Sequence, residues 1–120
     1  GVFVRSDAEL KRARNAVKAA GARAVELNEK VEVEDGAVAI STMHFAKGLE
    51  FRSVVVMACD DDVIPQSDRI EMVANDADLE EVYNTERHLL YVACTRARDH
   101  LLVTGIAPVS EFVDDFLRTR

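Results

Sequence analysis

Arginine is the residue type in this chain that points most directly to phosphate chemistry. Arg96 stands in the step Thr95-Arg96-Ala97, at the end of a segment whose apolar residues recur at helical spacing. An arginine presents a planar, permanently charged fork that can stabilise the negative charge on a transferring phosphoryl group. A cation near a helix C-terminus can also simply complement the helix dipole. Arg96 is therefore a candidate catalytic residue.

A second candidate, Arg5, follows the short apolar run Val2-Phe3-Val4 and precedes Ser6-Asp7-Ala8-Glu9. A serine with a glutamate three residues later is a capping-box pattern, in which the serine side chain accepts from a free helix N–H and the glutamate bonds back to the serine backbone. The pattern predicts a strand, then Arg5 at its end, then a helix that ends near Gly21.

The segment from Ser41 to Phe51 contains further residues suited to binding a phosphorylated ligand. Gly48 can adopt the positive φ of a tight turn, which lets the backbone approach a ligand closely. The Glu50 carboxylate can accept from a hydroxyl group, and Thr42 and His44 add a hydroxyl and an imidazole that can form hydrogen bonds. Lys47 could bind a phosphate or could tie the loop down through a carboxylate, and the sequence leaves both open.

The elements that must position these residues alternate along the chain. The run Ser53 to Cys59 is continuously apolar and β-branched, as in a central parallel strand covered on both faces. Other strands are expected at residues 2–4, 24–27, 31–33, 38–40 and 100–104, with a turn at Asp35-Gly36, and further helices at about 79–98 and from Ser110 onward. This order predicts an α/β layered fold with a mostly parallel central sheet flanked by helices.

Composition limits the classes of function. With 48% hydrophobic residues in 120, the chain suits a single domain spanning 1–120. It contains no apolar run of the roughly 20 residues that a membrane span requires. The start at Gly1 has no signal-peptide pattern, so we expect a cytoplasmic protein without membrane contact, cut from a longer chain. The net charge of -7 argues against a broad basic surface for nucleic acid, so any DNA contact must be confined to a small part of the surface.

Metal and thiol chemistry are not expected. The two cysteines, Cys59 and Cys94, lie in apolar runs and are expected to be buried, reduced thiols. Three scattered histidines form no metal-ligand pattern. The acidic stretch Asp60-Asp61-Asp62 after a central strand has the outline of a magnesium-holding Walker B strand, but no G-x-x-x-x-G-K-[ST] loop accompanies it. We therefore expect a surface loop there.

Two blocks of sequence, residues 41–51 and 86–98, resemble motifs V and VI of the UvrD/Rep-like superfamily 1 DNA helicases. They occur in the same order and are separated by a strand and an acidic loop. The strand, Arg5 and following helix resemble motif IV, with Val4 where that motif often has an aromatic residue. The resemblance covers most of the chain and implies the second RecA-like lobe, domain 2A, without its large accessory insertion.

The resemblance also implies roles for the candidate residues. Arg96 and Arg5 would reach the γ-phosphate of ATP, and Gly48, Glu50 and Lys47 would lie at the nucleotide edge. Thr42 and His44 would contact single-stranded DNA. The expected cofactor is ATP with Mg²⁺, held mainly by an N-terminal RecA-like lobe that carries the Walker motifs, so this lobe alone should not hydrolyse ATP.

Two other functions fit parts of the sequence. The chain could be a non-catalytic remnant of the same fold that binds DNA or a protein. A phosphoacceptor signalling domain fits the length and the carboxylates after a central strand, but its first strand would have to end in an acidic pair, and it leaves residues 86–98 unexplained.

Overall fold

The computed structural model of the protein describes residues 1–27 and 36–118. Within them, five strands form one sheet in the order β2-β3-β1-β4-β5, and every pairing between these strands is parallel. The strands are β1 Val2–Val4, β2 Ala24–Glu26, β3 Val38–Thr42, β4 Phe51–Val56 and β5 Ala97–Val103. The predicted α/β fold with a parallel sheet is confirmed.

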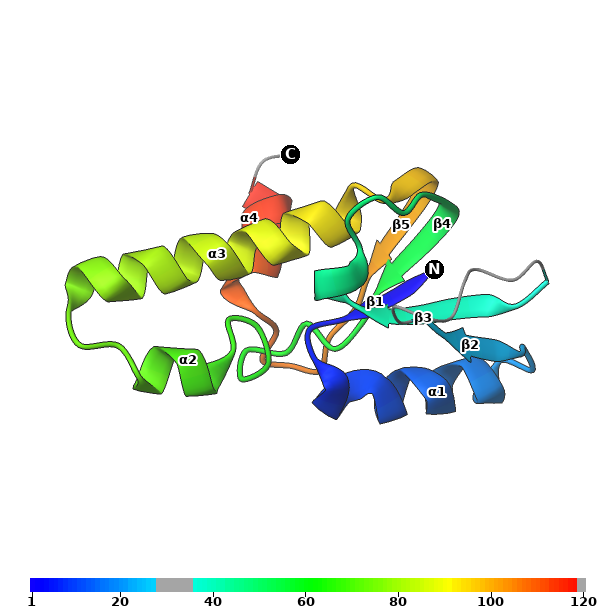
Figure 1. Ribbon diagram of the computed structural model, residues 1–120, viewed down its shortest axis with the longest axis horizontal. Helices are drawn as coiled ribbons and strands as arrows, with labels where there is room; N and C mark the ends of the chain where they lie inside the picture. The colour runs from blue at the N-terminus through cyan, green and yellow to red at the C-terminus, as the bar shows by residue number, and fades with distance from the viewer. Residues whose placement is uncertain (28–35, 119–120) are drawn as a thin grey trace.

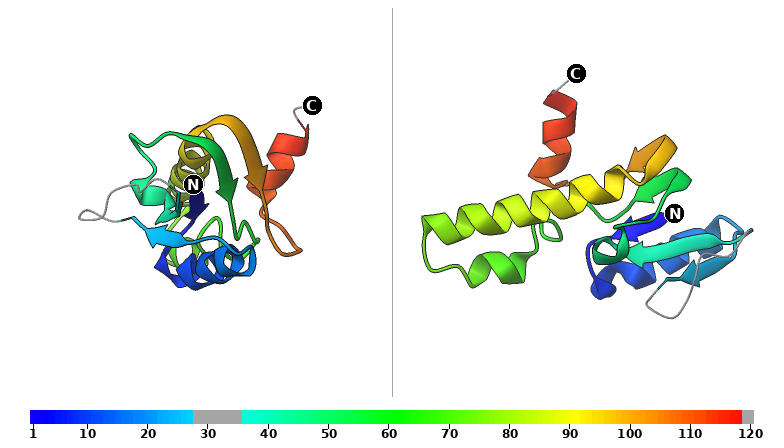
Figure 2. Two further views of the ribbon diagram at one scale, coloured as in Figure 1. Left: turned by 90° about the vertical axis from the view of Figure 1, so that its right-hand side faces the viewer. Right: turned by 45° about the horizontal axis from the view of Figure 1, so that its top comes forward.

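Helices cover both faces of this sheet (Figures 1 and 2). Helix α1, Leu10–Ala19, packs on one face, and α3, Asp76–Cys94, packs on the other. The short α2, Ser67–Glu71, lies beside the first half of α3, and α4, Glu111–Arg118, ends the described chain. Two 3-10 turns, η1 Asp7–Glu9 and η2 Met43–Phe45, follow β1 and β3 respectively.

The central strand β1 supplies the core on both sides because its side chains alternate between the two faces. Phe3 points toward α3 and packs in a cluster with Val54 and Leu90. Val2 and Val4 point toward α1 and pack with Val17. Each of these apolar side chains is nearly or fully buried, which stabilises the fold by about 1.5–3 kcal/mol per side chain. Burial on both faces therefore holds β1 in place and fixes the position of the residues that follow it.

The beginning of α1 differs from the expected capping box. Ser6 makes no side-chain cap bond, and its backbone carbonyl instead accepts from the Glu9 N–H at 3.0 Å. The Glu9 carboxylate pairs with Arg12 at 3.1 Å and does not reach back to Ser6. A 3-10 turn therefore precedes α1. The cap expected at the last helix is confirmed, because Ser110 Oγ accepts from the Phe112 N–H at 3.2 Å.

Several boundaries also differ from the sequence prediction. Helix α3 ends at Cys94 and not at residue 98, because the chain must turn at Thr95 and Arg96 for Ala97 to pair with Phe51. Helix α2 lies in a stretch predicted as an acidic loop. The strand predicted at residues 31–33 and Asp35 of the predicted turn lie outside the described residues.

The two cysteines are buried and unpaired, as predicted. Burial raises the pKa of Cys59 to about 12 and that of Cys94 to about 11, so both thiols stay protonated. In the part of the chain that the structure describes, no helix has the length and apolar character to cross a membrane.

Candidate functional site: two edges of one parallel sheet

The carboxyl ends of the strands carry a pocket of about 500 Å³, here called the carboxyl-edge pocket. Because all strands are parallel, the residues that follow β1, β3 and β4 meet at one edge of the sheet. The pocket is lined by Arg5, Ser6 and Asp7 after β1, by Thr42, His44 and Phe45 at the end of β3, and by Gln66 and Arg69 after β4.

This pocket lies where the connections of the sheet change sides. From β1 the chain continues into α1 on one face, whereas from the neighbouring β4 it continues toward α3 on the other face. In open α/β sheets, a crevice forms outside the carboxyl ends of two such strands and commonly binds the ligand. The topology therefore marks this edge as a binding position independently of any motif.

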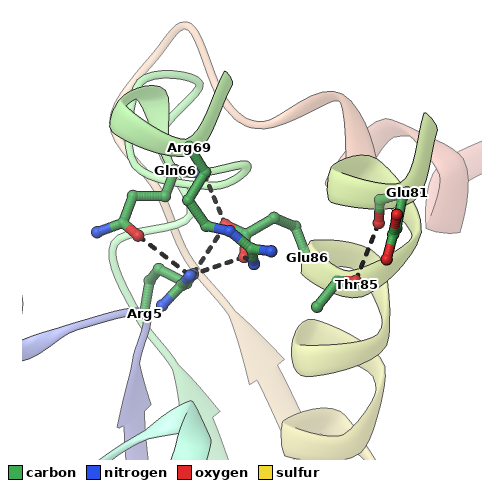
Figure 3. A network of polar contacts seen from close by, with 6 residues as sticks. All are labelled: Arg5, Gln66, Arg69, Glu81, Thr85 and Glu86. Atoms are coloured by element: carbon green, nitrogen blue, oxygen red, sulfur yellow. Dashed lines mark hydrogen bonds and ion pairs between the residues drawn. The ribbon is translucent and has the colours of Figure 1, made fainter. Parts of the chain in front are cut away.

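A buried carboxylate, Glu86 on α3, organises the pocket wall (Figure 3). Arg5 donates to it twice, from Nε to Oε1 at 2.9 Å and from Nη2 to Oε2 at 2.7 Å. Arg69 Nη1 donates to Oε2 at 2.9 Å, and the Gln66 backbone N–H donates to Oε1 at 2.6 Å. The Gln66 side-chain oxygen accepts from Arg5 Nη2 at 3.2 Å. Glu86 thus ties the end of β1 and helix α2 to the middle of α3.

Opposing effects act on the ionisation of Glu86. Burial alone would raise the pKa of this carboxyl group, but the hydrogen bonds from Arg5 and the Gln66 N–H, with the charges of Arg5 and Arg69, hold the pKa below its ordinary value. Glu86 is therefore a carboxylate at neutral pH. Arg5 is also buried, so loss of Glu86 would leave the charge of Arg5 buried without an ionic partner.

The turn η2 presents two side chains outward at the carboxyl edge. Thr42 ends β3 and is mostly buried, whereas His44 and Phe45 are exposed. Met43 and Ala46 on either side of them are buried in the core. The turn is therefore anchored at both ends, and its outward side chains have a fixed position.

From η2 the chain crosses to the opposite edge, where the strands begin. Gly48 has φ +84°, the left-handed conformation that glycine adopts without strain, so the turn expected at this position is present. Lys47, Gly48 and Glu50 are all exposed, and Lys47 forms no ion pair with a described carboxylate. The Phe51 N–H then donates to the Arg96 carbonyl at 2.9 Å.

Arg96 lies at this amino edge, between the end of α3 and the start of β5. Its Nε donates to the Val92 carbonyl at 3.2 Å, and its Nη2 donates to Thr95 Oγ1 at 3.2 Å. Both acceptors are uncharged, and Arg96 forms no ion pair within the described residues. No described carboxylate therefore offsets the charge of this guanidinium, which lies beside the loop that carries Gly48 and Glu50.

Comparison with known proteins agrees with this architecture. Residues 12–107 match the model of the UvrD-like helicase C-terminal domain. The chain belongs to this family. It is 41% identical over 78 residues to the putative ATP-dependent DNA helicase YjcD of Bacillus subtilis and 38% identical over 82 residues to the ATP-dependent DNA helicase PcrA of the same organism. These matches cover 63% and 67% of this chain and 10% of each relative.

A solved structure gives the same result for the fold. The C-terminal domain of a possible DNA helicase from Lactobacillus plantarum superposes with a TM-score of 0.62 and 25% sequence identity, over 93% of this chain and 58% of that one. The predicted family and the predicted fold class are therefore confirmed.

The predicted site residues form two groups. Arg5, Thr42 and His44 line the carboxyl-edge pocket. Gly48, Glu50 and Arg96 lie at the amino edge, which we define by these three residues. Phe3 is level with Val56 and Phe51 with Ala97, so Arg5 and Arg96 are separated by roughly 25 Å along the strands at ~3.3 Å per residue. The structure does not bring these two arginines together, although the motif resemblance placed both at one γ-phosphate.

Glu86 was not among the site residues selected from the sequence. Glu86 is fully buried and bonds Arg5 and Arg69, while Arg87 lies over the Phe112 ring with its Cζ 4.9 Å from the centroid. A signal was available, because residues 83, 86, 90 and 93 share the apolar face of α3. A glutamate at such a position needs buried cations.

Phe45, Gln66 and Arg69 were also missed as pocket residues. Gln66 and Arg69 could not be found from a motif, because the predicted loop that contains them folds into α2.

The acidic stretch Asp60-Asp61-Asp62 differs along its length. Asp61 and Asp62 are exposed, as predicted, whereas Asp60 binds Arg12 at 2.7 Å and the Ile106 N–H at 2.7 Å. Among the described residues, no group of acidic, histidine or cysteine side chains is arranged to hold a metal ion.

Proposed function

We propose that this chain is the C-terminal motor lobe of an ATP-dependent DNA helicase or translocase. In this proposal its amino edge faces ATP and its carboxyl edge faces single-stranded DNA. The observation that carries the proposal is the separation of the two residue groups at opposite ends of the same parallel strands, in a chain of the UvrD-like helicase C-terminal family.

At the amino edge, we propose that Arg96 contacts the γ-phosphate of ATP. Its guanidinium has no acidic partner among the described residues, so its charge is available to an incoming phosphate. Gly48 lets the loop approach the nucleotide closely, Glu50 accepts from a ribose hydroxyl, and the exposed Lys47 faces a phosphate. ATP with Mg²⁺ is held mainly by an N-terminal RecA-like lobe with the Walker motifs, and the metal neutralises phosphate charge there.

At the carboxyl edge, we propose that the Thr42 hydroxyl and the His44 imidazole bond phosphate oxygens of single-stranded DNA. Both line the carboxyl-edge pocket, in which Arg5 and Arg69 supply local positive charge to a chain of net charge -7. Arg5 is held there by Glu86, so we assign it to the wall of this pocket and only Arg96 to the γ-phosphate.

The two edges act together when the lobes close over ATP. Closure brings Arg96 to the nucleotide while Thr42 and His44 hold the DNA, and cycles of closure and opening step the two lobes along the strand. Without the residues of the first lobe, this lobe alone binds no phosphate chain tightly and does not hydrolyse ATP.

The test replaces Arg96 by alanine in a protein that contains both lobes, with the first lobe either native or joined from the related B. subtilis PcrA. Arginines that contact a transferring phosphoryl group typically contribute on the order of 10³-fold to turnover. We expect DNA-stimulated ATP hydrolysis to fall by about that factor while DNA affinity stays the same. Arg98→Ala is the matched control, because Arg98 is exposed at the start of β5 and pairs with Asp99 at 3.6 Å.

Loss of less than about twofold in Arg96→Ala would contradict the assignment, since it is far below the contribution expected of such an arginine. The chain would then be better described as a non-catalytic module of the same fold that binds DNA or a protein.

A further inference from the structure

We infer that the carboxyl-edge pocket binds one nucleotide of single-stranded nucleic acid, with Phe45 stacking on the base and Arg69 contacting the adjacent phosphate. The inference rests on the proposed function, because it concerns the same DNA edge. It adds a base-contacting residue and a second phosphate-contacting residue to an edge for which Thr42 and His44 had been proposed.

Phe45 has the position and exposure of a stacking platform. Its side chain is 43% exposed although it lines a pocket between two arginines and a histidine. The turn that carries it is anchored by the buried Met43 and Ala46, so the ring loses little conformational freedom when a base packs on it. An aromatic face next to a cationic groove is the usual arrangement for binding single strands, because every base can stack on it.

Arg69 has donors left for a ligand. Only its Nη1 bonds Glu86, and its side chain is 37% exposed at the pocket. The bond to Glu86 fixes the guanidinium in place, and the described residues engage neither its Nε nor its Nη2. A fixed guanidinium with free N–H groups suits a phosphate oxygen.

Arg5 adds a further donor to the same wall. Its Nε and Nη2 are engaged by Glu86 and Gln66, but no described residue accepts from its Nη1. Every side-chain nitrogen and oxygen that is cut off from solvent in the described part of the chain has a partner, so this Nη1 retains contact with solvent. The two arginines share one carboxylate, which leaves this cluster one net positive charge.

One acidic side chain opposes that charge. Asp7 lines the same pocket, is exposed, and forms no ion pair with a described residue. It therefore provides a test of opposite sign, since its removal should strengthen the binding of a phosphate while removal of Arg69 should weaken it.

The preference for single strands follows from the stacking contact. A base in a duplex has both faces covered by its neighbours, so it can pack against Phe45 only after it is unstacked. A nucleotide phosphate such as that of ATP could also meet Arg69, and this alternative is separated in the experiment by measuring both ligands.

The absence of tryptophan from the 120 residues makes a direct optical test possible. In the Phe45→Trp variant of the full chain, the single indole replaces the stacking ring, and we expect an oligo-dT to quench its fluorescence to a saturable limit. Tyr91→Trp is the matched control, because Tyr91 is 59% exposed on α3 and does not line the pocket. Equal quenching in the two variants would overturn the inference.

A second measurement separates stacking from a structural effect of residue 45. The wild-type chain should bind oligo-dT at least about fivefold more tightly than an abasic strand of equal length, since one stacked base contributes that much or more. Phe45→Ala should bind both strands with the same affinity. A base preference that persists in Phe45→Ala would contradict the role of Phe45.

The charged residues are tested by salt dependence. Arg69→Gln should weaken binding of normal and abasic strands equally and reduce the slope of log K against log salt by about 0.7 for one phosphate contact. Asp7→Asn should strengthen both. If Arg69→Gln left DNA affinity unchanged and weakened ATP use in the two-lobe protein, the phosphate at Arg69 would belong to the nucleotide and the inference would fail.

These outcomes are distinct from failure of the proposed function. If alanine at His44 weakens DNA binding while Phe45→Ala does not change the base preference, the DNA edge stands and the stacking site is wrong. If neither the chain nor the two-lobe protein binds oligonucleotides, the proposed function and this inference both fail.

Discussion

The two edges of the sheet hold their arginines in different ways. At the carboxyl edge, Arg5 and Arg69 are fixed by bonds to the buried carboxylate of Glu86. At the amino edge, the described residues hold Arg96 through a backbone carbonyl and a hydroxyl of its own helix end. A guanidinium bonded to a carboxylate gains an attraction between opposite charges that a neutral acceptor does not provide. The arginines of the carboxyl edge are therefore fixed before a ligand binds, whereas the Arg96 side chain at the amino edge can adopt another position.

This difference suits the two ligands proposed for the lobe. A DNA-contacting wall that is fixed before binding avoids the cost of ordering long side chains when the strand arrives. An arginine that must reach a nucleotide held by another lobe has to leave its resting bonds, and a charged phosphate is a stronger acceptor than the carbonyl and the hydroxyl that these bonds use. The resting position of Arg96 is thus easily exchanged for a phosphate.

The largest expected effect comes from breaking the fixed edge. Glu86→Ala leaves Arg5 buried without its partner, which should lower the free energy of unfolding by about 3–5 kcal/mol. Urea denaturation followed by circular dichroism measures this loss. Glu81→Ala is the control, since Glu81 is exposed on the same helix and its loss should cost less than about 0.5 kcal/mol. Equal small losses in both variants would mean that the edge is not fixed by Glu86.

Acid should weaken the same edge. Because the folded-state pKa of Glu86 lies below its unfolded value, its stabilising contribution is fully present above the unfolded pKa of about 4.3 and is lost as pH falls through the folded pKa. Asp60 contributes with the same sign, since the hydrogen bond from Arg12 lowers its pKa. Glu86→Gln should therefore reduce, but not abolish, the loss of stability between pH 6 and pH 3. A pH dependence unchanged in that variant would contradict this account.

A smaller effect is expected at the amino edge. Gly48→Ala introduces a side chain at φ +84° with no atom within 4 Å of the new Cβ, so only backbone strain of about 1–2 kcal/mol opposes it. Gly21→Ala is a matched control, with φ +78° and equally open space. Both variants should lose similar stability in thermal unfolding, whereas only Gly48→Ala should impair ATP use in the two-lobe protein. Equal ATP use would separate Gly48 from the nucleotide.

Much of the fold could be predicted from local patterns. The β-branched run around Val54 and the apolar period of α3 identified a central strand and its covering helix, because burial on both sides of a parallel sheet dictates those patterns. The capping box failed because the Glu9 carboxylate pairs with Arg12, one helical turn further on. Helix α2 was missed because its five residues carry too little periodicity to detect.

The candidate site was predictable in its residues more than in its arrangement. Motif resemblance selected Arg5 and Arg96 but gave no reason to separate them. The rule that separates them is simple, since Arg5 follows a strand and Arg96 precedes one, and parallel strands place those positions at opposite edges. The link between Glu86 and Arg5 spans 81 positions and required the tertiary structure.

The most direct test of the two-edge account measures two quantities on two variants of the two-lobe protein. His44→Ala should raise the Kd for an oligo-dT about tenfold, the loss of one bond to a charged phosphate, and leave ATP turnover at saturating DNA unchanged. Arg96→Ala should lower turnover by on the order of 10³-fold and leave the Kd for DNA unchanged. If each variant altered both quantities in the same proportion, the two edges would not be separate sites and the account would be wrong.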